Sequence, residues 1–124
     1  MDATVMTHPV HAAVLRLCRE FIRIDSQNPP GDTRAMAQAV ARALEHPAIE
    51  VTLHEPQPGI VNVVAVLRGA MPGPRVVLNG HLDTFPIGPR EGWTHDPLGA
   101  EQVGDCIYGR GAGDMKAGLA ILVR

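Results

Sequence analysis

Two apolar runs constrain the fold of this chain more than any other sequence feature. Residues 61–67 are nearly all apolar, and Val76, Val77 and Leu78 are apolar without interruption. Successive apolar positions are typical of strands that are covered on both faces, whereas a strand with one wet face alternates. The runs therefore predict an α/β fold in which helices cover a sheet of about four strands.

Two helices are predicted ahead of these runs. The first is expected to be capped by Thr7 and to end near Asp25, where turn-forming residues begin. Its apolar residues follow the spacing of one helical face, and they are Val10, Val14, Leu17, Phe21 and Ile24. This spacing predicts an amphipathic helix that packs against the sheet.

The second helix is predicted to start after Asp32 or Thr33 and to be ended by Pro47. Residues 49–53 alternate between apolar and polar, which predicts a strand with one wet face. A short strand is predicted at 106–108, after a long loop. Long loops in compact domains often carry function.

Composition excludes several function classes. The chain has 124 residues, with 11 Lys and Arg against 13 Asp and Glu, so its net charge of −2 offers no basic footprint for nucleic acid. Its longest apolar run, 117–123, is far shorter than the ~20 residues of a membrane span, and no signal peptide is recognised. Cys18 and Cys106 form no metal-type spacing and are expected to be reduced, which favours a cytoplasmic location.

The first candidate site directly follows the second apolar run. Residues 79–83 read Asn-Gly-His-Leu-Asp, and ligands in open α/β sheets bind at the carboxyl ends of strands. His81 and Asp83 are two residues apart, so in an extended chain their side chains point to the same side. A carboxylate there can accept the second ring N–H of a metal-binding histidine, although a His-x-Asp pair also arises by chance in many chains.

The second candidate site is a glycine-rich turn at 109–116, with the sequence Gly-Arg-Gly-Ala-Gly-Asp-Met-Lys. Alternating glycines permit a tight turn that brings Asp114 to the start of a helix, where one carboxylate can bridge two metal ions. A dinucleotide-binding loop would need glycine at position 114, and a P-loop would need Gly-Lys-Ser/Thr around Lys116. Neither nucleotide motif fits.

Other polar residues receive structural interpretations. His95 is expected to be a surface loop histidine, and Trp93 to pack its loop. Arg110 is expected to pair structurally and Lys116 to form an ion pair. The remaining histidines are expected to be solvated, namely His8, His11, His46 and His54.

Four segments in this order carry a resemblance to a known family. They are residues 24–32, 77–84, 93–97 and 108–116, and they include both candidate sites. The sequence resembles the M20 family of zinc-dependent amidohydrolases and peptidases, which includes acetylornithine deacetylase, succinyl-diaminopimelate desuccinylase, aminoacylase and glutamate carboxypeptidase. The resemblance implies a three-layer α/β sandwich of the zinc-peptidase type, incomplete here, with residues 1–124 as the N-terminal part of the metal-binding catalytic domain.

The resemblance also implies roles for single residues. His81 and Asp114 would be metal ligands, with Asp114 bridging two divalent ions, zinc in the first place and cobalt or manganese as alternatives. Asp83 would be the catalytic carboxylate that orients His81, and the Asp114–Met115 peptide bond would be cis. The implied reaction is hydrolysis of an amide bond in a small-molecule N-acyl amino acid or short peptide by a metal-activated water.

The family needs further residues that this sequence does not supply, because no Asp, Glu or His follows Asp114. The Glu-Glu pair with its general base, a later acidic ligand, a final histidine and the dimerisation (lid) domain are expected in a longer parent protein, itself expected to be a homodimer. Catalytic zinc normally takes three protein ligands. The 124-residue chain alone is therefore expected to be inactive and to bind zinc weakly.

Three alternatives stand beside this hypothesis. One is a truncated, non-catalytic remnant. Another is a related dinuclear zinc aminopeptidase, which also uses a His-x-Asp step, although the turn at 109–116 favours M20. A nucleotide-binding module is disfavoured by the glycine spacing. In each case apolar surface is expected to be exposed around 61–67 and 119–123, because elements that would cover the sheet are absent.

Overall fold

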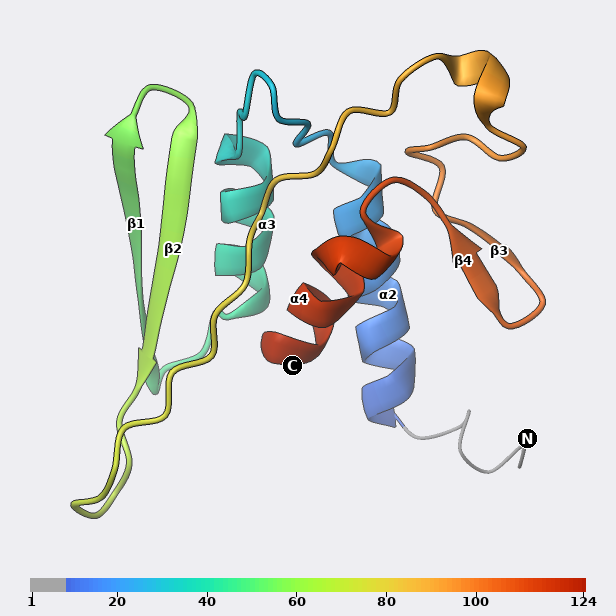
Figure 1. Cartoon of the computed structure of the whole chain (residues 1–124). Coiled ribbons are helices and arrows are strands. Elements are labelled where there is room, and N and C mark those ends of the chain that lie inside the picture. Colours follow the sequence, from blue (N-terminus) through green and yellow to red (C-terminus); the bar gives the residue numbers. More distant parts are fainter. Residues whose placement is uncertain (1–8) are drawn as a thin grey trace.

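Three helices and two pairs of antiparallel strands form the described part of this computed structural model, residues 9–124 (Figure 1). In chain order they are α2 (Pro9–Arg23), α3 (Arg34–Ala43), β1 (Ile49–Gln57), β2 (Ile60–Leu67), β3 (Glu101–Val103), β4 (Cys106–Tyr108) and α4 (Ala117–Leu122). A short 3-10 turn, η1 (Arg90–Gly92), and an irregular turn, η2 (Ala112–Lys116), complete the set. The mixed α/β class expected from the sequence is confirmed, but the expected sheet of about four strands is wrong for residues 9–124, because the strands form two separate two-stranded sheets.

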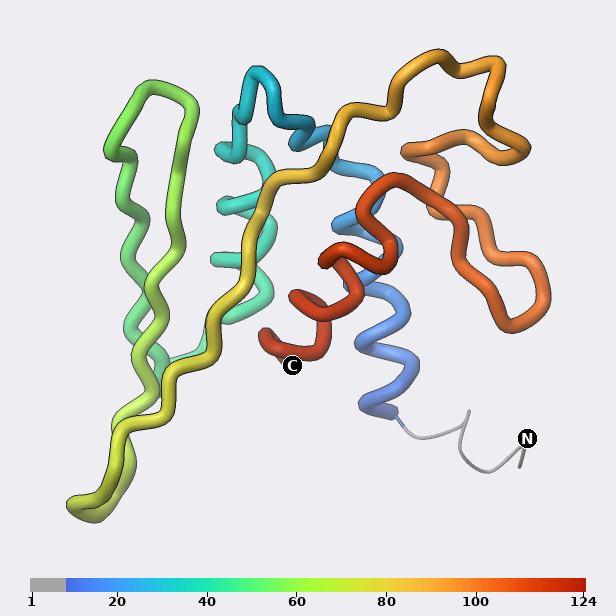
Figure 2. Tube along the Cα trace, viewed as in Figure 1, coloured from blue at the N-terminus to red at the C-terminus, as the bar shows by residue number. Residues whose placement is uncertain are grey.

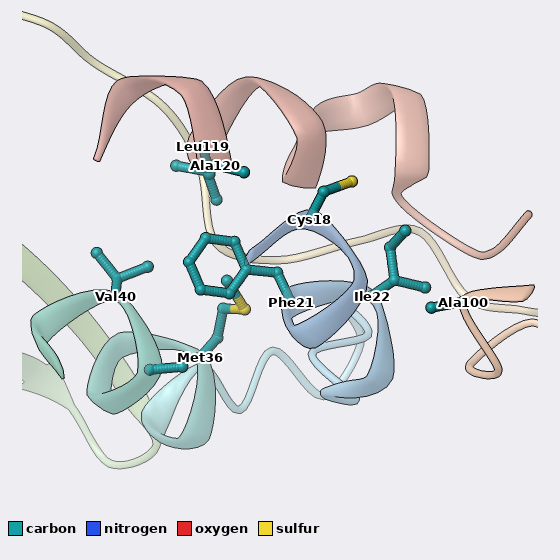
Figure 3. Packing of buried hydrophobic residues seen from close by; sticks show 9 residues of the cluster. Cys18, Phe21, Ile22, Met36, Val40, Ala100, Leu119 and Ala120 are labelled. Carbon is teal, nitrogen blue, oxygen red and sulfur yellow. The ribbon is translucent and has the colours of Figure 1, made fainter. Parts of the chain in front are cut away.

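The hydrophobic core lies where α2, α3 and α4 meet (Figure 3). Phe21 is fully buried and lies between Met36 of α3 and the α4 residues Leu119 and Ala120. The rest of this buried cluster consists of Cys18, Ile22, Ala39, Val40 and Ala100. The core is therefore built mainly from helix–helix contacts and not from a sheet.

Both predicted helices are confirmed, with small differences at their ends. α2 ends at Arg23, close to the expected Asp25, and Val14, Leu17 and Ile24 pack against the core, whereas Val10 is exposed. The predicted cap, Thr7, lies outside the described residues. Apolar spacing predicts these helices well because one face of each helix is buried, and apolar residues therefore recur with the helical period.

α3 starts directly after Thr33 and ends at Ala43, before the predicted stop at Pro47. The Thr33 hydroxyl donates to the carbonyl of Val61 (3.0 Å) and accepts the backbone N–H of the same residue (2.7 Å). This buried pair of hydrogen bonds ties the start of α3 to β2. These two hydrogen bonds fix the position of α3 relative to the β1–β2 hairpin.

β1 and β2 form an isolated antiparallel hairpin with Ile49 opposite Leu67 and Leu53 opposite Val63. α3 packs against β2, yet Val64, Val66 and Leu67 are 47%, 39% and 67% exposed. The expectation of a strand covered on both faces is therefore wrong for the described residues, because no second layer of this chain lies against them. The predicted exposure of apolar surface is confirmed at 64–67, although Val61 is buried. At 119–123 the prediction is wrong for Leu119 and Ala120, which are buried in the core, and it is confirmed for Ile121, which is 64% exposed.

The strand predicted at Val76–Leu78 is also wrong. These residues follow an extended path, shown by the yellow trace in Figure 2, but they pair with no strand in the described part of the chain and are 67–79% exposed. Strand residues need a neighbour that accepts and donates backbone hydrogen bonds. β2, the other apolar run, pairs with β1 along one edge, and its second edge is paired with no strand of residues 9–124.

The short strand predicted at 106–108 is confirmed as β4, which pairs with β3 across a turn at Gly104. Cys18 is buried, Cys106 is exposed, and both are free, as expected. No helix of residues 9–124 is long and apolar enough to cross a membrane.

The helix–helix core predicts a clear difference between two phenylalanines. Phe21→Ala removes a fully buried ring from the core, whereas Phe85→Ala changes a ring that is 75% exposed. We expect Phe21→Ala to lower the free energy of unfolding by about 3–5 kcal/mol and Phe85→Ala to change it little. Urea denaturation followed by circular dichroism measures both, with Phe21→Leu as a milder variant. Equal effects of the two alanine variants would contradict this core.

Candidate metal centre

Two residues that lie 33 positions apart in the sequence meet at the candidate metal centre. His81 Nε2 is 2.8 Å from Oδ1 of Asp114. The backbone N–H of His81 also contacts the sulfur of Met115 at 3.2 Å. The extended segment and the glycine-rich turn, predicted separately from sequence, therefore form one site.

The glycine-rich turn presents Asp114 through an unusual backbone path. Gly111 has a φ of +77°, a left-handed conformation that favours glycine. A Cβ built on Gly111 would lie 2.4 Å from the Thr84 side chain. The backbone N–H of Lys116 closes the turn on the carbonyl of Gly111 at 2.9 Å. The Asp114–Met115 peptide bond is cis, as the family resemblance implied.

Lys116 holds this turn against the end of α2. Its side chain is almost fully buried, and its ammonium donates a 2.6 Å hydrogen bond to the carbonyl of Ile24, just after α2. The predicted ion pair is wrong, because the partner is a backbone carbonyl. Burial lowers the pKa of Lys116 to about 8, although the charge of Asp25 opposes this effect.

Asp83 lies on the other side of the His81 ring. His81 Nδ1 is 2.9 Å from the Asp83 carbonyl oxygen and 3.2 Å from its carboxylate oxygen Oδ1. Both acceptors therefore face the nitrogen that does not contact Asp114. A nitrogen held in this way presents its N–H to the acceptor, which leaves Nε2 as the ring nitrogen that is available to a metal ion.

The electrostatics of the site follow from these contacts. The hydrogen bond to Asp114 raises the pKa of His81, although partial burial opposes it. The pKa of Asp83 is lowered, chiefly because the amide of Asn28 donates to its Oδ2 at 3.0 Å. Asp83 is therefore held in its anionic form, which is the form that can accept a ring N–H.

The loop after α2 holds the segment that carries His81. Ser26 donates its hydroxyl to the carbonyl of Leu82 at 2.8 Å. Gln27 and Thr84 form an isolated parallel bridge. The side-chain role of Asn28 was not recognised from sequence, since Asn28 and Asp83 are separated by 55 positions. The sequence indicated Asn28 only as part of segment 24–32, one of the four segments that resemble the family.

The loop at 93–97 packs beside the turn. Trp93 donates its ring N–H to the carbonyl of Ile87 at 2.7 Å, so it packs its loop as expected. The guanidinium of Arg110 lies 4.9 Å from the centre of the Trp93 ring. His95 is not simply a surface residue, because its Nδ1 is 2.9 Å from Glu101 and the centre of its ring is 4.0 Å from that of Tyr108, with the two planes tilted by 33°.

The donor set suits a divalent transition metal but does not complete a site. An imidazole nitrogen and a carboxylate oxygen are typical zinc ligands, and two ligands on one tetrahedral zinc lie about 3.3 Å apart. His81 Nε2 and Asp114 Oδ1, at 2.8 Å, therefore need to separate only slightly to admit an ion. No group of three or more His, Cys, Asp or Glu in residues 9–124 is arranged to hold one.

Comparison with known proteins places these residues in a family context. Residues 77–124, which include His81, Asp83 and Asp114, match the family described as peptidase family M20/M25/M40.

Three similar proteins carry the name succinyl-diaminopimelate desuccinylase. The chain is 37% identical over 117 residues to a succinyl-diaminopimelate desuccinylase of Leptothrix cholodnii, an alignment that covers 92% of this chain and 30% of that protein. It is 37% identical over 115 residues to the protein of the same name from Methylorubrum extorquens, covering 88% and 28%. Succinyl-diaminopimelate desuccinylase 1 of a Ruegeria species is 60% identical over 42 residues, covering 34% and 11%. The chain thus spans less than a third of the length of these relatives.

Two glycines of the same turn predict opposite tolerance to substitution. Gly111→Ala meets both an unfavourable φ and the Thr84 side chain, whereas a Cβ at Gly113 has nothing within 4 Å. We expect Gly111→Ala to lower the free energy of unfolding by about 1–3 kcal/mol and Gly113→Ala to leave it nearly unchanged. Thermal denaturation of the two variants tests this. A larger loss in Gly113→Ala would show that the turn has another backbone path.

Proposed function

Residues 77–124 belong to the peptidase family M20/M25/M40, and on that premise we propose that this chain contributes half of the metal site of an amide hydrolase. The observation that carries the proposal is the 2.8 Å contact between His81 Nε2 and Asp114 Oδ1. Sequence-distant donor atoms of two types meet there, at the end of a loop held by buried groups. The two side chains are themselves 45% and 74% exposed, so a ligand can reach them from solvent.

The residues that would hold the metal are His81 and Asp114. A divalent ion bound there supplies Lewis acidity, which polarises a carbonyl and lowers the pKa of water. We propose two such ions, with Asp114 shared between them, and zinc as the metal. Cobalt and manganese remain alternatives because the same ligands accept several divalent metals.

The surrounding residues set the state of these ligands. Asp83 faces Nδ1 of His81 with two acceptor oxygens, and it therefore orients the ring so that Nε2 ligates. Asn28 keeps Asp83 anionic and in position. Lys116 and Gly111 fix the turn that carries Asp114. Each of these contacts restricts the motion of a ligand side chain before the metal ion binds, and this lowers the conformational entropy that binding would cost.

We propose hydrolysis of an amide bond in an N-acyl amino acid as the reaction. Water adds to the acyl carbon, the C–N bond breaks, and a carboxylate and an amine leave. The names of the similar proteins make succinyl-diaminopimelate the first substrate to test. A related dinuclear zinc aminopeptidase activity is the alternative, and it would cleave peptides with a free amino end instead.

The proposal extends to the organisation of the parent protein. Residues 1–124 would be the N-terminal part of a catalytic domain with the three-layer zinc-peptidase sandwich. The exposed apolar runs at 64–67 and 76–78 support this, since both are suited to be covered or paired in a larger sheet. A homodimeric parent follows from the family resemblance. The two free cysteines favour a cytoplasmic location.

The half site predicts that the chain alone is inactive. We expect the purified 124-residue chain with zinc, cobalt or manganese to release no succinate from succinyl-diaminopimelate, and to bind zinc much more weakly than a three-ligand site. The reading frame that contains this chain, expressed in full, is expected to be active. Metal-dependent hydrolysis by the chain itself would contradict the half-site assignment. A frame that ends at Arg124 would support the remnant alternative.

Substitutions in the full reading frame test the individual roles. His81→Ala and Asp114→Ala are expected to lower kcat/KM by about 10³-fold or more, because a ligand is lost. Asp83→Asn is expected to lower metal affinity by about 10–100-fold. His54→Ala and Asp105→Asn, both at exposed positions, are matched controls and should behave as the parent. Isothermal titration with zinc and initial rates measure these effects. Full activity of His81→Ala would overturn the proposed site.

A further inference from the structure

A hollow of about 310 Å³ lies on the face of α2 that is turned toward β3. Its lining is unusually rich in arginine: it consists of Ala12, Leu15, Arg16, Arg19, Arg23 and Gln102. It shares no residue with the metal centre. The three arginines are three and four positions apart, so they lie on one face of the helix.

The charges of this face are not balanced by ion pairs among residues 9–124. Like charges at these spacings disfavour a helix, and none of the three arginines forms an ion pair with a carboxylate in residues 9–124. Glu20, the acidic residue of α2, lies 4.0 Å from Arg42 of α3. Glu101, next to Gln102, pairs with His95 instead. Glu20 and Glu101 thus contact residues outside the hollow.

Structural roles account for only part of this pattern. Arg19 donates from Nε to the carbonyl of Ala100 at 3.1 Å, which ties α2 to the start of β3. Arg23 lies in the last turn, where a cation is favourable to the helix dipole. Arg16 lies in the middle of the helix and has neither role. The bond from Nε also fixes the Arg19 side chain while leaving its terminal nitrogens available to donate.

We propose that this hollow binds a small, multivalent oxyanion of the phosphate class. The guanidinium group presents several N–H donors in a fixed plane that matches two oxygens of a phosphate. Three guanidinium groups balance an anion of two or three charges, whereas a monocarboxylate would leave most of their charge uncompensated. A volume of about 310 Å³ accommodates more than a single phosphate, so pyrophosphate or a small phosphate monoester fits as well.

The test measures anion binding to the 124-residue chain at constant ionic strength. EDTA is present throughout, so that no metal ion at His81 and Asp114 can bind the anion. Isothermal titration and ³¹P NMR are run with inorganic phosphate, pyrophosphate and glycerol phosphate, which separate an inorganic from an organic source. Succinate is the comparison anion of another chemical class. Saturable binding of a phosphate compound, tighter than that of succinate, is expected.

A charge-matched pair of double variants assigns the binding to the hollow. Arg16→Gln with Arg23→Gln leaves the structural bond of Arg19 intact, and is expected to weaken binding at least tenfold. Arg75→Gln with Arg124→Gln removes the same charge from two exposed positions outside the hollow, and is expected to change binding less than twofold. Far-UV circular dichroism checks that both variants keep the helix content of the parent.

Three results would overturn the proposal. The first is the absence of saturable binding for every phosphate compound. The second is equal weakening in the two double variants, which would mean general charge attraction. The third is succinate binding as tightly as pyrophosphate, which would mean that the hollow does not select the phosphate class. None of these results bears on the proposed hydrolase activity, because the hollow and the metal centre have no residue in common.

Discussion

The parallel bridge between Gln27 and Thr84 is the contact on which the candidate metal centre depends. The segment before it has no strand partner among the described residues, and its apolar side chains at 76–78 are exposed. The backbone N–H of Thr84 reaches the carbonyl of Ser26 at 2.9 Å, and its carbonyl accepts from Asn28 at 2.8 Å. Together with the Ser26 hydroxyl on the Leu82 carbonyl and the Asn28 amide on Asp83, these bonds hold His81 and Asp83 over the turn that carries Asp114.

One region, the end of α2 with the loop that follows it, positions both halves of the site. The loop after α2 holds the histidine segment through backbone bonds and through Ser26. The same region also receives Lys116, whose ammonium donates to the carbonyl of Ile24. Burying an ammonium is costly unless it is hydrogen-bonded. The end of α2 thus fixes both halves of the site, and the core around Phe21 fixes α2.

Local patterns predicted the parts of the fold that depend on neighbouring residues. The helices at 9–23 and 34–43 follow from apolar spacing and turn residues, and the hairpin strand at 106–108 was also foreseen. The segment 76–78 was not, because whether an apolar run becomes a strand depends on an edge elsewhere in the chain. β2 was mispredicted for the same reason. Its apolar composition indicates a strand covered on both faces, but no element of residues 9–124 covers the second face.

Within the site, sequence spacing predicted the residues that meet but not the contacts that support them. His81, Asp83 and Asp114 lie together, and they were found because their types and spacing suit a metal. Asn28 and Lys116 were missed in their roles, since an amide 55 positions away and a lysine on a backbone carbonyl leave no periodic signal. Both roles are visible only in the structure, where these side chains lie close to their partners.

The exposed segment and the half-formed site are physically coupled. His81 follows Leu78 by only three positions, so any strand that pairs with 76–78 would also restrict the backbone that carries the histidine. Ordering a ligand before the ion arrives removes part of the entropy cost of binding. Completing the sheet would therefore raise metal affinity even if it added no ligand. The exposed residues 76–78 and the candidate ligand His81 lie on one stretch of backbone, so the pairing of that stretch affects both the sheet and the candidate site.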